Sequence, residues 1–231
     1  AYELASCLVG SEMCIRDSIN EIGSLALAGL GVTFPIIIFI GAFSALFGTG
    51  GAPRAAIAMG CNDNERAEKI LGNCTMMLII CSIILSVFFM ITKDKILIMF
   101  GASENTLPYA SSYITIYLIG TMFLQLTLGL NAFITNQGFT KTSMITICIG
   151  AVLNIILDPI FIFVFHLGVQ GAALATIISQ GISCIWVLKF LTGNKTHIKI
   201  RIKNLRLSKQ IVFLVISLAV SYTHLRAHET R

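Results

Sequence analysis

Long uncharged stretches alternate with short charged ones along most of the chain, and they predict membrane-spanning helices. A helix needs about 20 apolar residues to cross the hydrocarbon core of a bilayer. Five stretches reach that length, with spans predicted near 32–51, 70–92, 107–133, 142–165 and 171–191. A sixth apolar run covers 210–219, where it stops after about half the length of a span. Since no strand-like alternation appears, the pattern predicts an all-α, polytopic transmembrane helical bundle with five complete spans and a truncated sixth.

Glycine, proline and charged residues indicate how these spans begin and end. Gly29, Gly31 and Pro35 indicate an interfacial piece near 20–30 that precedes the first span. The turn HLGVQG at 166–171 separates the fourth span from the fifth. Between the first and second spans, charged residues share the segment 53–71 with apolar ones, which predicts a short amphipathic helix at the membrane surface.

The composition supports a membrane location and disfavours several other classes. The chain is 56% hydrophobic and 12% charged, with a mean hydropathy of +0.87, whereas about 25% of the residues in a soluble domain are charged. Its seven cysteines include no CxxC pair, so the sequence predicts neither a zinc site nor a disulfide framework. The net charge of +5 is concentrated in one loop, which bears on topology and does not indicate a nucleic-acid partner.

Basic residues are divided unevenly between alternate loops. The loops after the first, third and fifth spans carry Arg54, Arg66, Lys69, Lys141, Lys195, Lys199, Arg201, Lys203, Arg206 and Lys209. The other loops carry only Lys93 and Lys95. By the positive-inside rule the first set faces the cytoplasm, so 193–209 is expected to be a basic cytoplasmic loop and 166–171 an outer turn. A chain whose first span runs inwards usually lacks a preceding helix, so we expect this sequence to be a fragment.

The two ends differ from the rest of the chain. Residues 1–18 and 220–231 closely resemble translated sequencing adaptors, and we expect neither to belong to the fold. Residues 1–18 also lack the basic region followed by an apolar run that is typical of a signal peptide.

Asp158 is the one acidic residue within a long apolar stretch. A charge at bilayer depth is costly, and such residues commonly mark ion or substrate paths. Asn154 lies one helical turn earlier and therefore on the same face. Pro159 has no N–H to donate to the carbonyl of Ile155, which leaves that oxygen available to a cation or to water. We therefore predict a cation or proton site at Asp158 and Asn154; the alternative is a structural carboxyl that holds helices together.

Other residues within the spans have two interpretations each. Gln125 and Asn131 are expected to line a cavity or to lie near the membrane interface. Pro35 is expected to bend the first span, with a position in the cavity and a role in gating as the alternative. Small residues at 171, 172, 175 and 181 favour close contact between helices.

An enzyme is not predicted. Catalysis would require a nucleophile–base pair or clustered metal ligands, and an isolated aspartate with an asparagine provides neither. We expect no cofactor and no bound metal other than a transported cation, with Na⁺ at Asp158 and Asn154 as one such case. Lys and Arg are absent from the spans, which disfavours a cargo that carries phosphate.

A series of short motifs covers most of the chain. They include GLGVTFP (29–35), GTGGA (48–52), ERAEKILGN (65–73), LIMFGASE (97–104), NIILDP (154–159) and GVQGAALATIISQ (168–180). Together these motifs resemble the amino-terminal half of multidrug and toxic compound extrusion (MATE) transporters over 20–216. The series is fairly specific, although each glycine motif alone would be a weak signal.

The resemblance implies the architecture and the cellular setting of the protein. It implies a twelve-helix transporter with two lobes, of which 19–192 would form helices two to six of the amino-terminal lobe and 210–219 the start of the seventh. The implied location is the plasma (inner) membrane of a prokaryote. The implied partners are the lipid bilayer, small organic substrates, and the missing first helix and carboxy-terminal lobe.

The resemblance also implies an antiporter that exports drugs or toxic organic compounds, cationic or amphiphilic, in exchange for H⁺ or Na⁺. Asn154 and Asp158 match the cation site of the amino-terminal lobe, and Thr176 matches the residue that contributes a hydroxyl group to it. The acidic residue on the family's first helix has no counterpart here. A lipid-linked saccharide flippase of the wider superfamily is the alternative, and it would be expected to line its cavity with basic residues.

Overall fold

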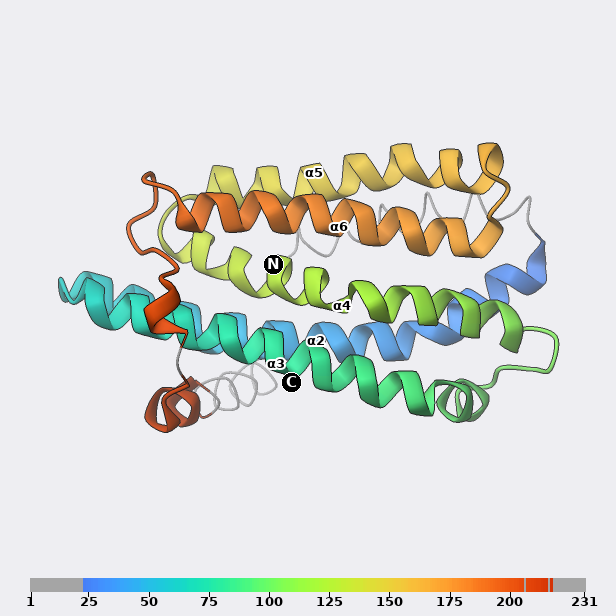
Figure 1. Ribbon diagram of the computed structural model, residues 1–231, viewed down its shortest axis with the longest axis horizontal. Coiled ribbons are helices and arrows are strands. Elements are labelled where there is room, and N and C mark those ends of the chain that lie inside the picture. The colour runs from blue at the N-terminus through green and yellow to red at the C-terminus, as the bar shows by residue number, and fades with distance from the viewer. Residues whose placement is uncertain (1–22, 206, 216, 218–231) are drawn as a thin grey trace, which may run out of the picture.

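Five long helices make up the computed structural model, which describes residues 23–205, 207–215 and 217 (Figure 1). They are α2 (Ser24–Gly60), α3 (Asn64–Met99), α4 (Leu107–Asn136), α5 (Thr140–Pro159) and α6 (Gly168–Thr192). A π-helical turn, η1 (Ile160–Val164), follows α5, and a short 3₁₀ turn, η2 (Ile202–Asn204), follows α6. All five helices are long and apolar enough to cross a membrane, and no strand occurs among the described residues. The predicted all-α transmembrane fold is confirmed, whereas the predictions for 1–18 and 220–231 lie outside the described residues.

The first two helices are longer than the spans predicted within them. The separate amphipathic helix predicted at 53–71 was wrong, because 53–60 complete α2 and 64–71 begin α3. The chain turns between them at Asn62, whose φ of 59° is uncommon for a residue other than glycine. Asp63 then caps α3 by accepting a hydrogen bond from the backbone N–H of Arg66 at 3.0 Å.

The interfacial piece predicted near 20–30 was also wrong, because α2 already begins at Ser24. Gly29 does not interrupt the helix and lies instead where α2 approaches α4. A Cβ atom at Gly29 would lie 3.0 Å from the carbonyl oxygen of Thr106 and 3.2 Å from the Cβ of Tyr109. The glycine therefore permits close packing, which a local sequence pattern does not distinguish from a helix break.

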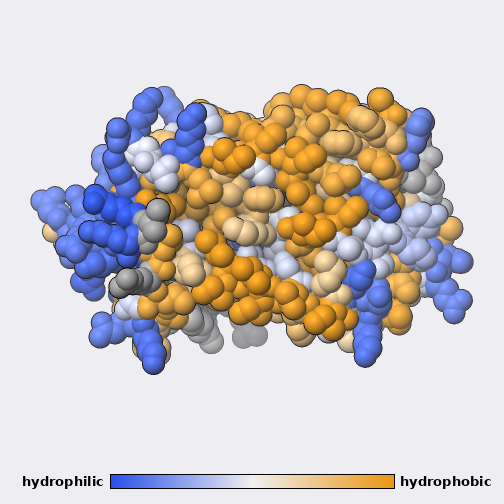
Figure 2. Space-filling model, in the orientation of Figure 1, coloured by the Kyte–Doolittle hydropathy of each residue, from blue (hydrophilic) through white to orange (hydrophobic). Residues whose placement is uncertain are grey.

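Helix α4 is the centre of the bundle and packs against α2, α3, α5 and α6. One apolar cluster includes Leu78, Leu130 and Phe133, and a second includes Ile40 and Ile114. The outer faces remain apolar and exposed, as at Ile91 on α3 and Ile185 on α6. Figure 2 shows this apolar surface as a broad band between two hydrophilic ends. Such a band is typical of a surface that faces lipid.

The helices alternate in direction, so the loops gather at two ends of the bundle (Figure 1). The α2–α3 and α4–α5 turns share one end with the segment that follows α6, and the α3–α4 and α5–α6 turns share the other. The first end carries most of the basic residues, and we call it the basic end.

The segment 193–205 packs across the basic end. The Oε1 atom of Gln137 accepts hydrogen bonds from the Thr196 hydroxyl at 2.6 Å and from the backbone N–H groups of His197 and Ile198 at 3.1 and 3.2 Å. The carboxylate of Glu68 pairs with Arg201 at 2.8 Å. The basic loop predicted here is an ordered connection that contacts Gln137, at the end of α4, and Glu68, on α3. Its cytoplasmic location stays a prediction.

Candidate cation-binding site

Asp158 lies in the last turn of α5, directly before Pro159 and the π-helical turn η1. Asp158 is 1% exposed, and Asn154 on the same face is 4% exposed. Because Pro159 has no N–H, the regular ladder of hydrogen bonds is interrupted at this point. The chain continues as a wide turn in which the N–H of Phe165 donates to the carbonyl of Ile160 at 3.1 Å. Single π-helical turns of this kind occur frequently at functional sites.

Three polar side chains from α5 and α6 meet beside this turn. The Nδ2 atom of Asn154 donates to Oδ1 of Asp158 at 3.3 Å and to the hydroxyl of Thr176 at 3.4 Å. The Thr176 hydroxyl in turn donates to the carbonyl of Ala172 at 2.9 Å. The first two distances exceed the usual 2.9–3.0 Å for such bonds, so the cluster is loosely held. The structure thus brings together the three residues predicted as the cation site, and their binding role remains a prediction.

The second carboxylate oxygen of Asp158, Oδ2, is buried and has no hydrogen-bond partner. Within the described part of the chain, no Lys, Arg or His forms an ion pair with Asp158. A bare carboxylate removed from water is costly, so it requires a proton or a cation in its vicinity. The carboxylate, amide and hydroxyl oxygens of this cluster are hard donors of the kind that suit H⁺ or a small cation such as Na⁺.

Small residues bring α6 close to η1. A Cβ atom at Gly171 would lie 2.8 Å from both the carbonyl carbon and the carbonyl oxygen of Phe161. Ala172 and Ala175 are fully buried on the same helix. Gly181 differs, since a Cβ atom there would meet only a ring carbon of Phe123 at an ordinary 4.0 Å. The close contact predicted from these small residues is therefore present at Gly171 and not at Gly181.

The residues predicted to line a cavity lie outside the Asp158 cluster. Gln125 is fully buried; its Nε2 atom donates to the carbonyl of Ile40 at 3.2 Å, and its Oε1 atom has no partner. Asn131 is 5% exposed and donates to the carbonyl of Ser143 at 3.4 Å. Pro35 is exposed on α2. Gln125 and Asn131 hydrogen-bond to α2 and α5 and not to the Asp158 cluster, and their role in a cavity stays a prediction.

The sequence analysis missed a set of polar contacts between α4, α5 and α6. The Thr127 hydroxyl donates to the carbonyl of Gln180 at 3.3 Å, and the Ser183 hydroxyl donates to the carbonyl of Thr146 at 3.4 Å. The Oε1 atom of Gln180 is buried and has no partner. The sequence signal for these contacts was Gln180, because a glutamine within an uncharged span indicates a polar contact between helices.

Comparisons with known proteins identify the family. The MatE family model matches residues 4–160, a range that starts within the segment 1–18 discussed above. The multidrug export protein MepA of Staphylococcus haemolyticus is 30% identical over 186 residues, which are 80% of this chain and 41% of the relative. A FAD transporter of Shewanella oneidensis is 28% identical over 176 residues, 74% of this chain and 39% of the relative.

Solved structures of MATE transporters share the fold. A crystal structure of a MATE in the bent conformation has a TM-score of 0.88 at 24% identity and covers 93% of this chain and 48% of its own. The inward-facing conformation of a multidrug resistance MATE family transporter has a TM-score of 0.86 at 24% identity, with 91% and 48% covered. The chain thus spans about half the length of these structures and about two-fifths of the curated relatives. Because the family model matches most of its length, the chain belongs to the MatE family of multi-pass membrane transporters, which are not enzymes.

Proposed function

We propose that this chain is the amino-terminal lobe of an antiporter that exports drugs or toxic organic compounds in exchange for H⁺ or Na⁺. Asp158 binds the coupling cation, Asn154 holds the carboxylate in place, and Thr176, which contacts Asn154, contributes a further neutral polar group. The observation that carries the proposal is the buried, unpartnered Oδ2 atom of Asp158. The MepA relatives, which are multidrug export proteins, support the cargo class.

The coupling step follows from the contacts of Asn154. Without a cation, the Asn154 amide is the hydrogen-bond donor to the charged Asp158, while the same nitrogen reaches Thr176 on α6. A proton or Na⁺ at Oδ2 neutralises the carboxylate and thereby weakens the hydrogen bond that it accepts from Asn154. The balance between the α5 and α6 contacts then changes, and a local change in charge biases the positions of the two helices.

The charge of the interior favours a cationic or neutral amphiphilic cargo. The buried polar residues of the described part are neutral except for Asp158 and Glu68, and Glu68 lies at the basic end in its pair with Arg201. FAD and lipid-linked saccharides carry phosphates, whose recognition relies on basic side chains. A cargo of FAD, as in the FAD transporter relative, or of a lipid-linked saccharide is therefore less consistent with these residues.

Efflux from vesicles that contain the complete transporter tests this function. We expect a fluorescent cationic dye to be exported when an inward H⁺ or Na⁺ gradient is imposed, and export to stop when that gradient is collapsed. The gradient that drives export identifies the coupling ion. Export that ignores both gradients, or equal export of an anionic dye, would contradict the proposal.

The orientation of the lobe has its own test. We expect an impermeant thiol reagent added outside cells to label Gln170→Cys, beside the outer turn, and not Lys195→Cys, at the basic end. Both positions are exposed, so accessibility within the fold does not decide the result. The background should lack native cysteines because Cys61 and Cys148 are exposed. Both variants should be labelled after permeabilisation, and the reverse pattern in intact cells would refute the orientation.

A further inference from the structure

Gln180 of α6 lies in the interface with α5, one helical turn nearer the basic end than the Asp158 cluster. The two helices run antiparallel, and Asn154 of α5 contacts Thr176 of α6 at 3.4 Å. At the next turn, the Nε2 atom of Gln180 lies 3.9 Å from the place that a Cβ atom at Gly150 would take. Because Gly150 has no side chain, the end of Gln180 can lie against α5.

The side chains of Asn154 and Gln180 lean towards each other. Each Cα–Cβ bond in a helix tilts towards the N-terminus of that helix. Helix α5 begins at the basic end and α6 begins at the opposite end, so the tilts of these two residues converge. A small displacement of α5 would therefore bring the Asn154 amide to Gln180.

The Gln180 amide has an acceptor that is not in use. Its Oε1 atom is buried and lacks a hydrogen-bond partner among the described residues. The backbone of the same residue is fixed to α4, since its carbonyl accepts a hydrogen bond from the Thr127 hydroxyl at 3.3 Å. A buried acceptor without a partner is unfavourable. Gln180 thus offers a fixed acceptor to a donor that α5 can bring to it.

The middle of α5 is held less firmly than its two ends. Near the basic end the Thr135 hydroxyl donates to that of Ser143 at 2.8 Å, and beyond the other end η1 packs closely against Gly171. Between these points the hydrogen bonds that join the described residues of α5 and α6 are 3.4 Å long. The buried residues of α5 are all glycine or polar, namely Ser143, Thr146, Gly150, Asn154 and Asp158. Without apolar side chains locked into this interface, the middle of α5 is the part that can shift against α6.

The charge of Asp158 decides which acceptor holds the Asn154 amide. While the carboxylate is charged, its hydrogen bond with Asn154 is charge-assisted and is the stronger of the two. Once a cation neutralises Asp158, that advantage is lost, and the unpartnered oxygen of Gln180 becomes the better acceptor. We propose that Gln180 is a positioning residue of the cation site, which takes over the Asn154 amide when Asp158 is neutralised and draws the middle of α5 towards α6. This inference rests on the proposed function and adds to it the residue that converts cation binding into a helix movement.

Distances between spin labels test the movement on the chain itself. The labels are attached at Val152→Cys on α5 and Ile182→Cys on α6 in a background without native cysteines, and the two positions are 53% and 41% exposed. Asp158→Asn represents the neutral state and is compared with Asp158 in sodium-free alkaline buffer. We expect the neutral state to shorten the mean distance by about 1–2 Å, the usual amplitude of such helix shifts. The distance from Ile119→Cys on α4 to Ile182→Cys should stay constant.

Replacing Gln180 connects the movement to this residue. Gln180→Met keeps the length of the side chain and removes the acceptor, so Asp158→Asn should no longer change the distance. A merely structural role for Gln180 would alter the distance equally in both charge states and leave their difference intact.

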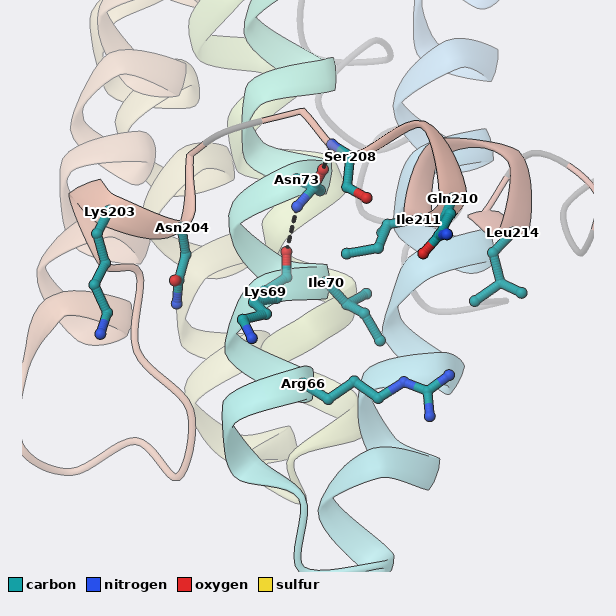
Figure 3. A pocket seen from close by; sticks show the side chains of 10 residues that line it. All are labelled: Arg66, Lys69, Ile70, Asn73, Lys203, Asn204, Ser208, Gln210, Ile211 and Leu214. Atoms are coloured by element: carbon teal, nitrogen blue, oxygen red, sulfur yellow. Dashed lines mark hydrogen bonds between the residues drawn. The ribbon is translucent and has the colours of Figure 1, made fainter.

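Two other glutamines provide matched controls. Gln125 also has a buried Oε1 atom without a partner among the described residues, but its amide donates to α2. Gln210 is exposed and lines a pocket between α3 and the segment that follows α6 (Figure 3). Gln125→Met and Gln210→Met should both keep the difference in distance that Asp158→Asn produces.

Equal distances for Asp158 and Asp158→Asn, or a difference that persists in Gln180→Met, would overturn the inference. If circular dichroism shows that Gln180→Met does not fold, Asn154→Ala replaces it, because it removes the donor and should likewise abolish the difference. Dye export by the complete transporter separates this inference from the proposed function. Loss of export in Asp158→Asn without a change in distance would keep the function and overturn the role of Gln180. Normal export with the expected change in distance would support the role of Gln180 and contradict the coupling role of Asp158.

Discussion

Replacing Asp158 with asparagine is expected to lower gradient-driven export more than about tenfold, and a tenfold change in rate corresponds to about 1.4 kcal/mol in the activation free energy. Asparagine keeps the shape of the side chain and removes its negative charge. Asp158 is 1% exposed and its carboxylate has one oxygen without a partner, so its charge must be balanced by a proton or a cation. The neutral amide has no such requirement, and we expect the variant to fold and insert while losing its coupling to the gradient.

Dye efflux from vesicles under an imposed H⁺ or Na⁺ gradient measures this effect, with protein insertion quantified in parallel. Asp94→Asn is the matched control, because it makes the same substitution at an exposed residue near the carboxy-terminal end of α3, away from the basic end. Its carboxylate accepts a hydrogen bond from Ser111 and lies outside the cluster. We expect that control to export near the normal rate. If Asp158→Asn also exported normally with unchanged gradient dependence, the carboxylate would be structural and coupling would have to be assigned elsewhere.

The two neutral members of the cluster should have smaller effects. Asn154→Ala removes the donor to Asp158. That bond is long, at 3.3 Å, so we assign it the roughly 0.5–1.5 kcal/mol of a typical hydrogen bond, which corresponds to about two- to tenfold in export. Thr176→Ala should have the least effect, because the Thr176 hydroxyl already donates to the carbonyl of Ala172. A Thr176→Ala effect as large as that of Asp158→Asn would contradict this order.

The helices and part of the site could be predicted from the sequence because both depend on local patterns. Apolar length places four of the five predicted spans within single helices, and the remaining one, 142–165, covers most of α5 and η1. The spacing of Asn154 and Asp158 places both on one face of α5, and the structure has a hydrogen bond between them at 3.3 Å. The position of Thr176 beside them came from the family resemblance and not from spacing, because it depends on how α6 packs against α5.

Other features depend on contacts between distant residues, so a local pattern does not specify them. Charged and apolar residues at 53–71 fit a surface helix as well as two helix ends that extend beyond the apolar band, and the turn at Asn62 decides between them. The connection after α6 is held by pairs such as the N–H of Ser208 with Asn73 at 2.7 Å, residues 135 positions apart. Pro159 predicted an interrupted helix, but the wide turn η1 is seen only together with the approach of Gly171.

Gly171→Ala is expected to destabilise the lobe, because the added methyl group would lie 2.8 Å from the backbone of Phe161. The two nearest atoms belong to the backbone, and the third is the Cβ atom of Phe161 at 3.1 Å, so α6 or η1 must shift as a whole. Adding a methyl group to a tightly packed contact costs about 1–3 kcal/mol. Each kcal/mol lowers the Tm of a chain of this size by about 2–4 °C. Thr176 lies on the same helix, so the shift should also weaken its contact with Asn154 and reduce gradient-driven export.

Gly31→Ala provides the matched control, since it makes the same substitution within a helix where nothing lies within 4 Å of the added atom. Gly31 is exposed on α2, and alanine there avoids the entropic cost of glycine in a helix, about 0.5–1 kcal/mol. The two variants should therefore move the Tm in opposite directions when thermal unfolding is followed by circular dichroism in detergent. A fall for both would indicate a general sensitivity of the helices to substitution, and no fall for Gly171→Ala would mean that η1 yields easily. Either result would contradict the close contact between α6 and η1 as a specific source of stability.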